Sequence, residues 1–190
     1  KDRIKTEILF FVPPDRNCEV HRVRITNLRE TAASLKLFSL VEFCLWNAFD
    51  DMTNYQRNLN TGEVEVEEGV IYHKTEYRER RNHYAFYGVN HQPAGFDTDR
   101  ETFFGPDNGF AEPRAVKEGT PGNSLAEGWS PIAAHCLEVN LAPGESRDLI
   151  FVLGYAENPP EEKWEKPGVI NKSVARRMLE EFSSSARVEE

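Results

Sequence analysis

Residues 41–87 read VEFCLWNAFDDMTNYQRNLNTGEVEVEEGVIYHKTEYRERRNHYAFY, and this stretch decides the fold class. An apolar run from Val41 to Trp46 ends in a loop of acidic and amide side chains. From Glu63 onward, acidic and apolar residues alternate, which is typical of a strand with one exposed face. Gly69 then marks a turn before the alternation resumes. The stretch therefore predicts a strand, a long polar loop and further antiparallel strands.

Alternation continues through the rest of the chain and predicts an all-β fold. Strands are expected at residues 4–12, 20–26, 35–46, 63–70, 70–77, 83–89, 134–141 and 149–155. The turn signal Ala142-Pro143-Gly144-Glu145 predicts that the last two strands form a hairpin. No segment repeats at a fixed period, so solenoids and propellers are not expected. A large antiparallel sandwich fits these strands best.

The composition changes after Tyr155, where AENPPEEKWEKPG forms a charged, proline-rich stretch. Asn171 then has the character of a helix N-cap, and an apolar stripe follows it, formed by Val174, Met178, Leu179 and Phe182. We divide the chain into a β domain, residues 1–157, and a linker with a linker helix, residues 158–190. The helix can pack on this domain or on one that follows, and we expect the chain to be a piece of a longer polypeptide.

Charge and cysteine content narrow the function classes. With 23 Lys and Arg against 32 Asp and Glu, the net charge is −9, which disfavours nucleic acid and anionic membranes as partners. The three cysteines, Cys18, Cys44 and Cys136, form no C-x-x-C pair. We interpret them as reduced core thiols, which favours a reducing, cytoplasmic compartment.

Few residues form a catalytic or metal-binding pattern. Asp50 and Asp51 are adjacent, whereas two glycosidase carboxyl groups flank a substrate about 5–9.5 Å apart. His73 and Glu76 have a spacing that places metal ligands on one face of a helix, but in a strand they point to opposite faces. The nucleophile-elbow and phosphate-loop motifs are absent. We therefore assign no catalytic residue and no metal site.

The loop residues Tyr55, Gln56, Arg57 and Asn58 carry side chains that hydrogen-bond and stack on sugars. A solvated turn is the alternative, and the residues alone favour it. Arg78 and Arg80 line one face of their strand, where a ladder of surface ion pairs is favoured over a phosphate site.

Long stretches of the chain resemble the cellobiose phosphorylase family, the inverting disaccharide phosphorylases of glycoside hydrolase family 94. They are TEILFFVP, the segment 41–87, AGFDTDRETFFGP, NSLAEGWSPIAAH and DLIFVLGYAENP. The resemblance implies an N-terminal β-supersandwich and the start of a helical linker, followed in the family by an (α/α)6-barrel. The family's general acid and most of its phosphate ligands lie in that barrel, so these 190 residues alone should be inactive.

The resemblance also implies a reaction and partners. Cellobiose and phosphate would give α-glucose 1-phosphate and glucose with inversion, with phosphate as co-substrate and no cofactor. The enzyme would be a homodimer, in which Tyr55, Gln56, Arg57 and Asn58 reach the acceptor sugar in the partner subunit's active site. Arg57 is the strongest candidate. A stand-alone carbohydrate-binding sandwich and a purely structural scaffold are the alternatives.

Overall fold

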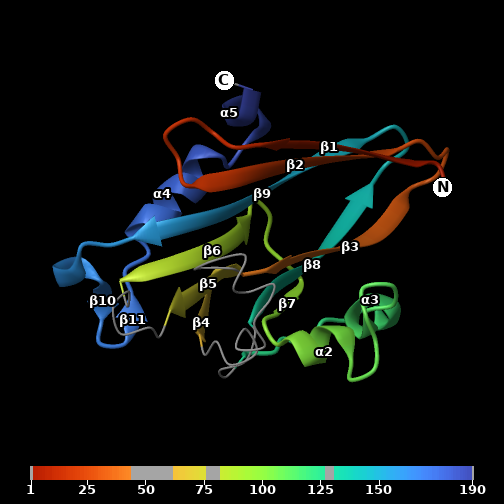
Figure 1. The fold of residues 1–190 in the computed structure, drawn as a ribbon. Helices are drawn as coiled ribbons and strands as arrows, with labels where there is room; N and C mark the ends of the chain where they lie inside the picture. The colour runs from red at the N-terminus through yellow and green to blue at the C-terminus, as the bar shows by residue number, and fades with distance from the viewer. Residues whose placement is uncertain (1, 44–61, 76–81, 127–130, 190) are drawn as a thin grey trace.

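The computed structural model describes residues 2–43, 62–75, 82–126 and 131–189. In this part of the chain two antiparallel sheets pack face to face (Figure 1). One sheet has six strands in the order β1-β2-β9-β6-β5-β4, and the other has three in the order β3-β8-β7. A small third sheet pairs β10 with β11. This arrangement confirms the predicted antiparallel sandwich.

The element bounds follow. The strands are β1 Ile4–Phe11, β2 Cys18–Asn27, β3 Ala33–Glu42, β4 Gly62–Glu67, β5 Val70–Thr75, β6 His83–Val89, β7 Gly95–Asp97, β8 Ile132–Leu141, β9 Ser146–Glu157, β10 Trp164–Lys166 and β11 Val169–Ile170. The helices are α2 Arg100–Phe104, α3 Arg114–Glu118, α4 Ser173–Glu181 and α5 Ser185–Glu189, with a 3₁₀ turn at Pro160–Glu162.

Alternating side chains build two apolar layers from the same strands. On β2, Val23 and Ile25 face the three-stranded sheet, whereas Cys18 and Val20 face the opposite side. This division follows from the two-residue period of a strand. The layer between the sheets also contains Ile71, Tyr87, Leu137, Val139, Leu149 and Phe151. Both faces of the six-stranded sheet are therefore apolar and need cover.

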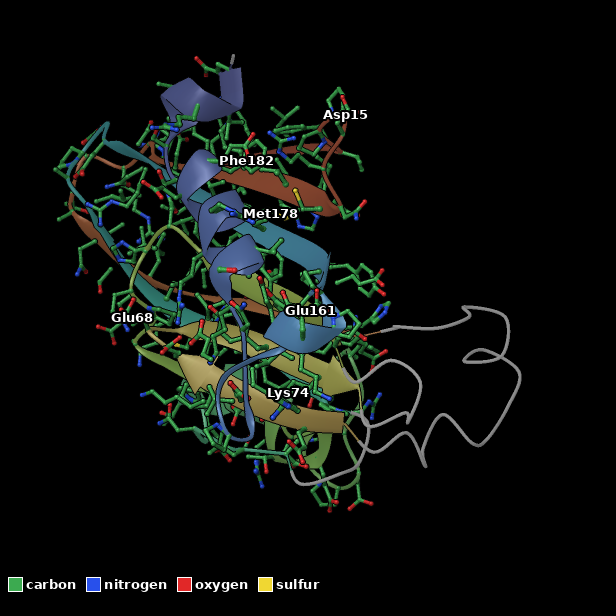
Figure 2. All side chains as sticks on the ribbon, turned by 90° about the vertical axis from the view of Figure 1, so that its left-hand side faces the viewer. Asp15, Glu68, Lys74, Glu161, Met178 and Phe182 are labelled. Atoms are coloured by element: carbon green, nitrogen blue, oxygen red, sulfur yellow. The ribbon has the colours of Figure 1, made fainter. Side chains whose placement is uncertain are left out.

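Helix α4 supplies the cover on the outer face of the six-stranded sheet, which Figure 2 views directly. Ala175 and Phe182 are buried there, and Met178 and Leu179 pack beside them. The apolar stripe predicted for this helix is confirmed, and its partner is this domain. The helix begins at Ser173, and its N-cap is Lys172, one residue after the predicted Asn171. The Asn171 side chain still accepts the Ser173 N–H at 3.0 Å.

Helices α2 and α3 cover the outer face of the three-stranded sheet. Phe103, Phe104 and Ala115 are buried against Ile132 and Ala134 of β8. Much of the glycine- and proline-rich region after β6 thus folds onto this chain's own sheet.

The predicted hairpin of residues 134–141 and 149–155 is wrong. β8 belongs to the three-stranded sheet and β9 to the six-stranded sheet, so residues 142–145 connect the two sheets. The turn itself forms, because Gly144 takes a φ of +75° and Glu145 N–H donates to the Ala142 carbonyl at 3.1 Å. Turn residues determine that the chain reverses, but the packing of both strand faces determines the pairing.

One smaller expectation concerns the cysteines. Cys18 and Cys136 are buried free thiols, as predicted, while Cys44 lies outside the described residues. Among the described helices, none is long and apolar enough to cross a membrane.

Candidate functional site

The predicted sugar-recognition residues Tyr55, Gln56, Arg57 and Asn58 lie outside the described residues. The same is true of Asp50, Asp51, Glu76, Arg78 and Arg80. The residues that flank these segments are described, and they show what the fold provides around the candidate site.

The residues that flank these segments gather at one end of the sandwich. They are Glu42, Phe43, Gly62, Thr75 and Ile132. Glu42, at the end of β3, lies opposite Ile132, at the start of β8. Gly62, at the start of β4, lies opposite Thr75, at the end of β5. The rings of Phe43 and His73 join the two sheets here, with centroids 5.0 Å apart. Segment 44–61 thus leaves from one sheet and enters the other at the same end.

Thr98 holds the described residues on both sides of segment 127–130. Its hydroxyl accepts the Ala126 N–H at 2.8 Å, and its carbonyl accepts the Ile132 N–H at 2.9 Å. Thr98 is completely buried, so this anchor is fixed in the core.

Asp97, beside Thr98, organises the loop before Ala126. Its buried carboxylate accepts the Gly122 N–H at 2.9 Å, the Ser124 N–H at 3.1 Å and the Ser124 hydroxyl at 2.7 Å. A buried carboxylate needs several such donors to replace its hydration. Gly122 leaves the space for this carboxylate, because a Cβ there would lie 2.9 Å from Asp97 Oδ1. No signal in the sequence marked Asp97 as such an anchor, although Asp97 lies in the segment FDTDRETFF, which is part of the family resemblance.

Arg100 of α2 fixes the end of β3. Its Nε donates to Glu42 Oε1 at 2.9 Å, and its guanidinium lies 4.7 Å from the ring centroid of Phe104. The guanidinium also faces the ring of Phe110 at 6.0 Å. Planar stacking and a carboxylate partner together define the arginine's position.

Two histidines lie inside the sandwich near this end. His135 stacks on Tyr87 with centroids 5.1 Å apart, and His73 lies on β5. Burial lowers the pKa of His73 to about 4 and that of His135 to about 4. Because both rings are neutral near pH 7 and are closed off from solvent, they are core residues and not exposed acids or bases.

A charged cluster lies on the outer face of the six-stranded sheet beside β4. Glu63 and Glu65 bind Lys74, with Nζ–O distances of 2.6 and 2.8 Å. Lys172, just before α4, lies 2.6 Å from Glu65 Oε2. The side chains of Lys74 and Lys172 are only 4% and 3% exposed. Lys74 also donates to the Gly168 carbonyl in the β10–β11 turn at 3.0 Å.

We call this cluster, formed by Glu63, Glu65, Glu67, Lys74, Lys172 and Arg176, the charged clasp. Glu63 and Glu67 are exposed, as predicted for a strand with one solvated face, whereas Glu65 between them is mostly covered, with 17% of its side chain exposed. Burial raises the pKa of Glu65, but hydrogen bonds from Lys172 and Lys74 outweigh burial and hold the pKa below its usual value. Arg176 adds bonds to Glu67 at 2.7 Å and to Glu165 at 2.5 Å. The clasp attaches the segment after Tyr155 to the strand that follows segment 44–61.

The described residues form a frame around segments 44–61, 76–81 and 127–130. Among residues 2–43, 62–75, 82–126 and 131–189, no group of three His, Cys, Asp or Glu side chains is placed to hold a metal ion. What the frame can do is hold the flanks of segments 44–61, 76–81 and 127–130 on a rigid core.

The chain matches a known protein family over nearly its whole length. A family model described as the supersandwich domain of glycosyl hydrolase 94 matches residues 1–184. An N,N'-diacetylchitobiose phosphorylase of Vibrio proteolyticus is 26% identical over 145 residues, and one of Vibrio furnissii is 30% identical over 149 residues. Each match covers 76% of this chain and 18% of the relative, so the chain spans less than a fifth of either relative's length.

Two solved structures are similar at low identity. A polysaccharide lyase matches with a TM-score of 0.49 and 13% identity, over 95% of this chain and 22% of that protein. A structure described as a kojibiose phosphorylase from the human microbiome matches with a TM-score of 0.47 and 10% identity, over 99% and 22%.

Proposed function

Because the chain belongs to the glycosyl hydrolase 94 family, as its supersandwich domain, we propose that it is the N-terminal domain of an inverting disaccharide phosphorylase. The family match over residues 1–184 is the observation that carries this proposal. The complete enzyme would cleave cellobiose with phosphate to α-glucose 1-phosphate and glucose. Catalytic groups would lie on a barrel domain beyond these 190 residues. The buried free thiols Cys18 and Cys136 support a reducing compartment such as the cytoplasm.

The chemistry needs little from this domain beyond positioning. Phosphate attacks the anomeric carbon from the face opposite the leaving group, where water attacks in an inverting hydrolase. A general acid protonates the glycosidic oxygen, and phosphate is already an anion, so a general base is unnecessary. The domain's share is to place acceptor-binding side chains, which must be held within fractions of an ångström to be effective.

Residues Tyr55, Gln56, Arg57 and Asn58 are our candidates for acceptor contacts, made in the partner subunit of a homodimer. The rigid flanks of segment 44–61 support this role, because Glu42 is fixed by Arg100 and Gly62 opens a strand held by the charged clasp. Arginine donates paired hydrogen bonds in a fixed geometry that suits sugar hydroxyls.

A second substrate is favoured by one observation. Both relatives that match the chain are N,N'-diacetylchitobiose phosphorylases. The complete enzyme can therefore be tested on cellobiose and on N,N'-diacetylchitobiose in parallel, with release of the sugar 1-phosphate as the readout.

The variant Arg57→Ala tests the acceptor role in the complete enzyme. Loss of a charged hydrogen bond costs about 1.5–3 kcal/mol, so the KM for the acceptor sugar in the synthetic direction should rise about 10- to 100-fold. The KM for phosphate in the phosphorolytic direction should not change. Arg147→Ala is the matched control, because Arg147 pairs with Glu145 at the opposite end of the sandwich. Unchanged acceptor KM and turnover in Arg57→Ala would remove this residue from the proposal.

A further inference from the structure

A pocket lies between the turn that joins β1 to β2 and the C-terminal helices α4 and α5. Figure 2 shows this turn at Asp15 and helix α4 at Phe182. The pocket has a volume of about 440 Å³, which falls within the range of small-molecule sites. It is lined by Phe11, Pro13, Pro14, Arg16, Glu181, Phe182, Arg187 and Val188.

One wall of the pocket is apolar and is held by the core. Phe182 is buried in the apolar layer beneath α4, and Phe11 and Val188 pack against that layer. The rings of Phe11 and Phe182 meet edge to face, with centroids 6.2 Å apart and an interplanar angle of 76°. Pro13 is buried at the same wall. Because the core already orders these side chains, a ligand that packs on them loses little affinity to the ordering of side chains.

The rim of the pocket carries charge. Arg16 Nε donates to Glu181 Oε2 at 2.9 Å, and Arg16 also donates to the Asp15 carbonyl at 3.1 Å, so its guanidinium is held in place. Arg187 lines the same pocket, and in the described part of the chain its side chain has no carboxylate partner. Two arginines and one glutamate give the lining a net charge of +1, whereas the whole chain carries −9. The pocket therefore attracts an anion on an otherwise acidic protein.

The apolar wall and the charged rim together select the class of ligand. An inorganic anion would use Arg187 and leave the rings uncovered, and a neutral sugar would leave the guanidinium without an anionic partner. A sugar phosphate uses both, because the C–H face of its ring packs on the aromatic wall and its phosphate accepts paired hydrogen bonds from arginine. Glu181 Oε1 has no hydrogen-bond partner among the described residues and can accept a bond from a ring hydroxyl.

We propose that this pocket binds a sugar phosphate, in which Arg187 binds the phosphate, Glu181 binds a ring hydroxyl and the two phenylalanine rings pack on the sugar. The inference rests on the proposed function, because the complete enzyme would release a sugar 1-phosphate, and it gives this domain a binding site for that product. A molecule bound here contacts both the turn after β1 and α5. Local opening of both elements should therefore slow when the product is bound.

The test measures hydrogen exchange of the complete protein with and without α-glucose 1-phosphate, and with α-N-acetylglucosamine 1-phosphate in parallel. The amides of residues 15–17 and 185–189 should exchange more slowly with a sugar phosphate present. In Arg187→Ala the concentration needed for half of this protection should rise at least tenfold, since a charged hydrogen bond is lost. Arg177→Ala is the matched control and should keep the protection, because Arg177 is exposed on α4 and does not line the pocket.

Glucose alone and inorganic phosphate alone, at the same concentrations, should protect these amides less. Equal protection by inorganic phosphate would overturn the inference, because the sugar would then make no contact. Equal protection by glucose would overturn it as well, because the phosphate would then have no part in binding.

The inference is also overturned if neither sugar phosphate protects these amides, or if Arg187→Ala and Arg177→Ala are protected equally. Phosphorolysis is measured separately on the unmodified protein. An active phosphorylase with unprotected amides refutes this site alone, whereas protection without phosphorolysis refutes the proposed function alone.

Discussion

At the scale of single residues, Asn27 closes the end of the sandwich where the chain passes between the sheets. Its side-chain amide donates to the carbonyls of Thr31 at 2.9 Å, Leu141 at 3.1 Å and Ala142 at 3.1 Å. Its side-chain oxygen accepts the Arg29 N–H at 3.0 Å. One completely buried residue thus joins the β2–β3 and β8–β9 connections.

Replacing Asn27 with alanine should destabilise the domain by about 2–4 kcal/mol, because it leaves several buried backbone groups without a partner. The free energy of unfolding in urea measures this effect. Asn140→Ala is the control, since Asn140 is exposed on β8 and should change stability by about 0.5 kcal/mol or less. Equal stability of the two variants would contradict the role given to Asn27.

The two buried histidines predict a pH dependence of stability. His73 and His135 have an ordinary pKa of 6.5 that burial lowers to about 4, so the unfolded chain binds more protons between these values. Their contribution to stability is complete above about pH 6.5 and is lost as the pH falls toward 4.

His135→Phe keeps an aromatic ring against Tyr87 and removes one of these titrations. The slope of unfolding free energy against pH should fall by about 1.4 kcal/mol per pH unit between pH 4.5 and 6. His91→Gln, at a half-buried surface position, serves as the control. An unchanged slope in His135→Phe would show that His135 is not buried in the neutral form.

At the scale of elements, helix α4 fits its sheet because two glycines leave room. A Cβ on Gly88 would lie 2.7 Å from Leu179 Cδ2, and one on Gly154 would lie 2.2 Å from Phe86 Cζ. Gly154 pairs directly with Phe86 in the strand register. The missing side chains on β6 and β9 therefore set how closely the ring of Phe86 and the helix approach the strands.

Gly154→Ala should destabilise the domain by about 1–3 kcal/mol, because Phe86 is fully buried and must shift. Gly109→Ala should be neutral, since a Cβ there meets nothing within 4 Å. Urea unfolding of both variants measures the difference. A neutral Gly154→Ala would mean that the core beneath α4 is loosely packed.

The charged clasp fixes the same helix electrostatically. Lys172→Met would leave Glu65 with Lys74 as its remaining ammonium partner, and should cost about 2–4 kcal/mol. Hydrogen exchange of the α4 amides should accelerate together with this loss. Lys117→Met is the control, because its ion pair with Glu112 at 3.4 Å is exposed on both sides. Unaltered exchange in α4 would contradict the clasp.

The sequence predicted where the strands and helices lie better than it predicted which strands pair. Alternation located β2, β6 and β9, and the apolar stripe located α4, because these signals are local. The hairpin of residues 134–141 and 149–155 failed, since pairing depends on which faces become buried. The solvated face that the alternation of β4 predicted is present at Glu63 and Glu67, but nothing local showed that Lys172 would return to bind Glu65.

At the scale of the whole molecule, the described residues form a frame whose strand ends flank segments 44–61, 76–81 and 127–130. Helix α4 and the charged clasp support β4 from outside, and Asp97, Thr98 and Arg100 support the other sheet's end. The sequence predicted Tyr55, Gln56, Arg57 and Asn58 as sugar ligands only through a family resemblance, and that assignment stays a prediction. The supersandwich fold itself was predicted and is confirmed.

The most direct test of this account is an assay of the complete protein for phosphate-dependent cleavage of cellobiose, with N,N'-diacetylchitobiose in parallel. We predict release of an α-sugar 1-phosphate from cellobiose that requires phosphate and inverts the anomeric configuration. If only N,N'-diacetylchitobiose is cleaved, the protein is still a phosphorylase, but its substrate is not cellobiose. Hydrolysis without phosphate, or no cleavage of either disaccharide, would contradict the central claim.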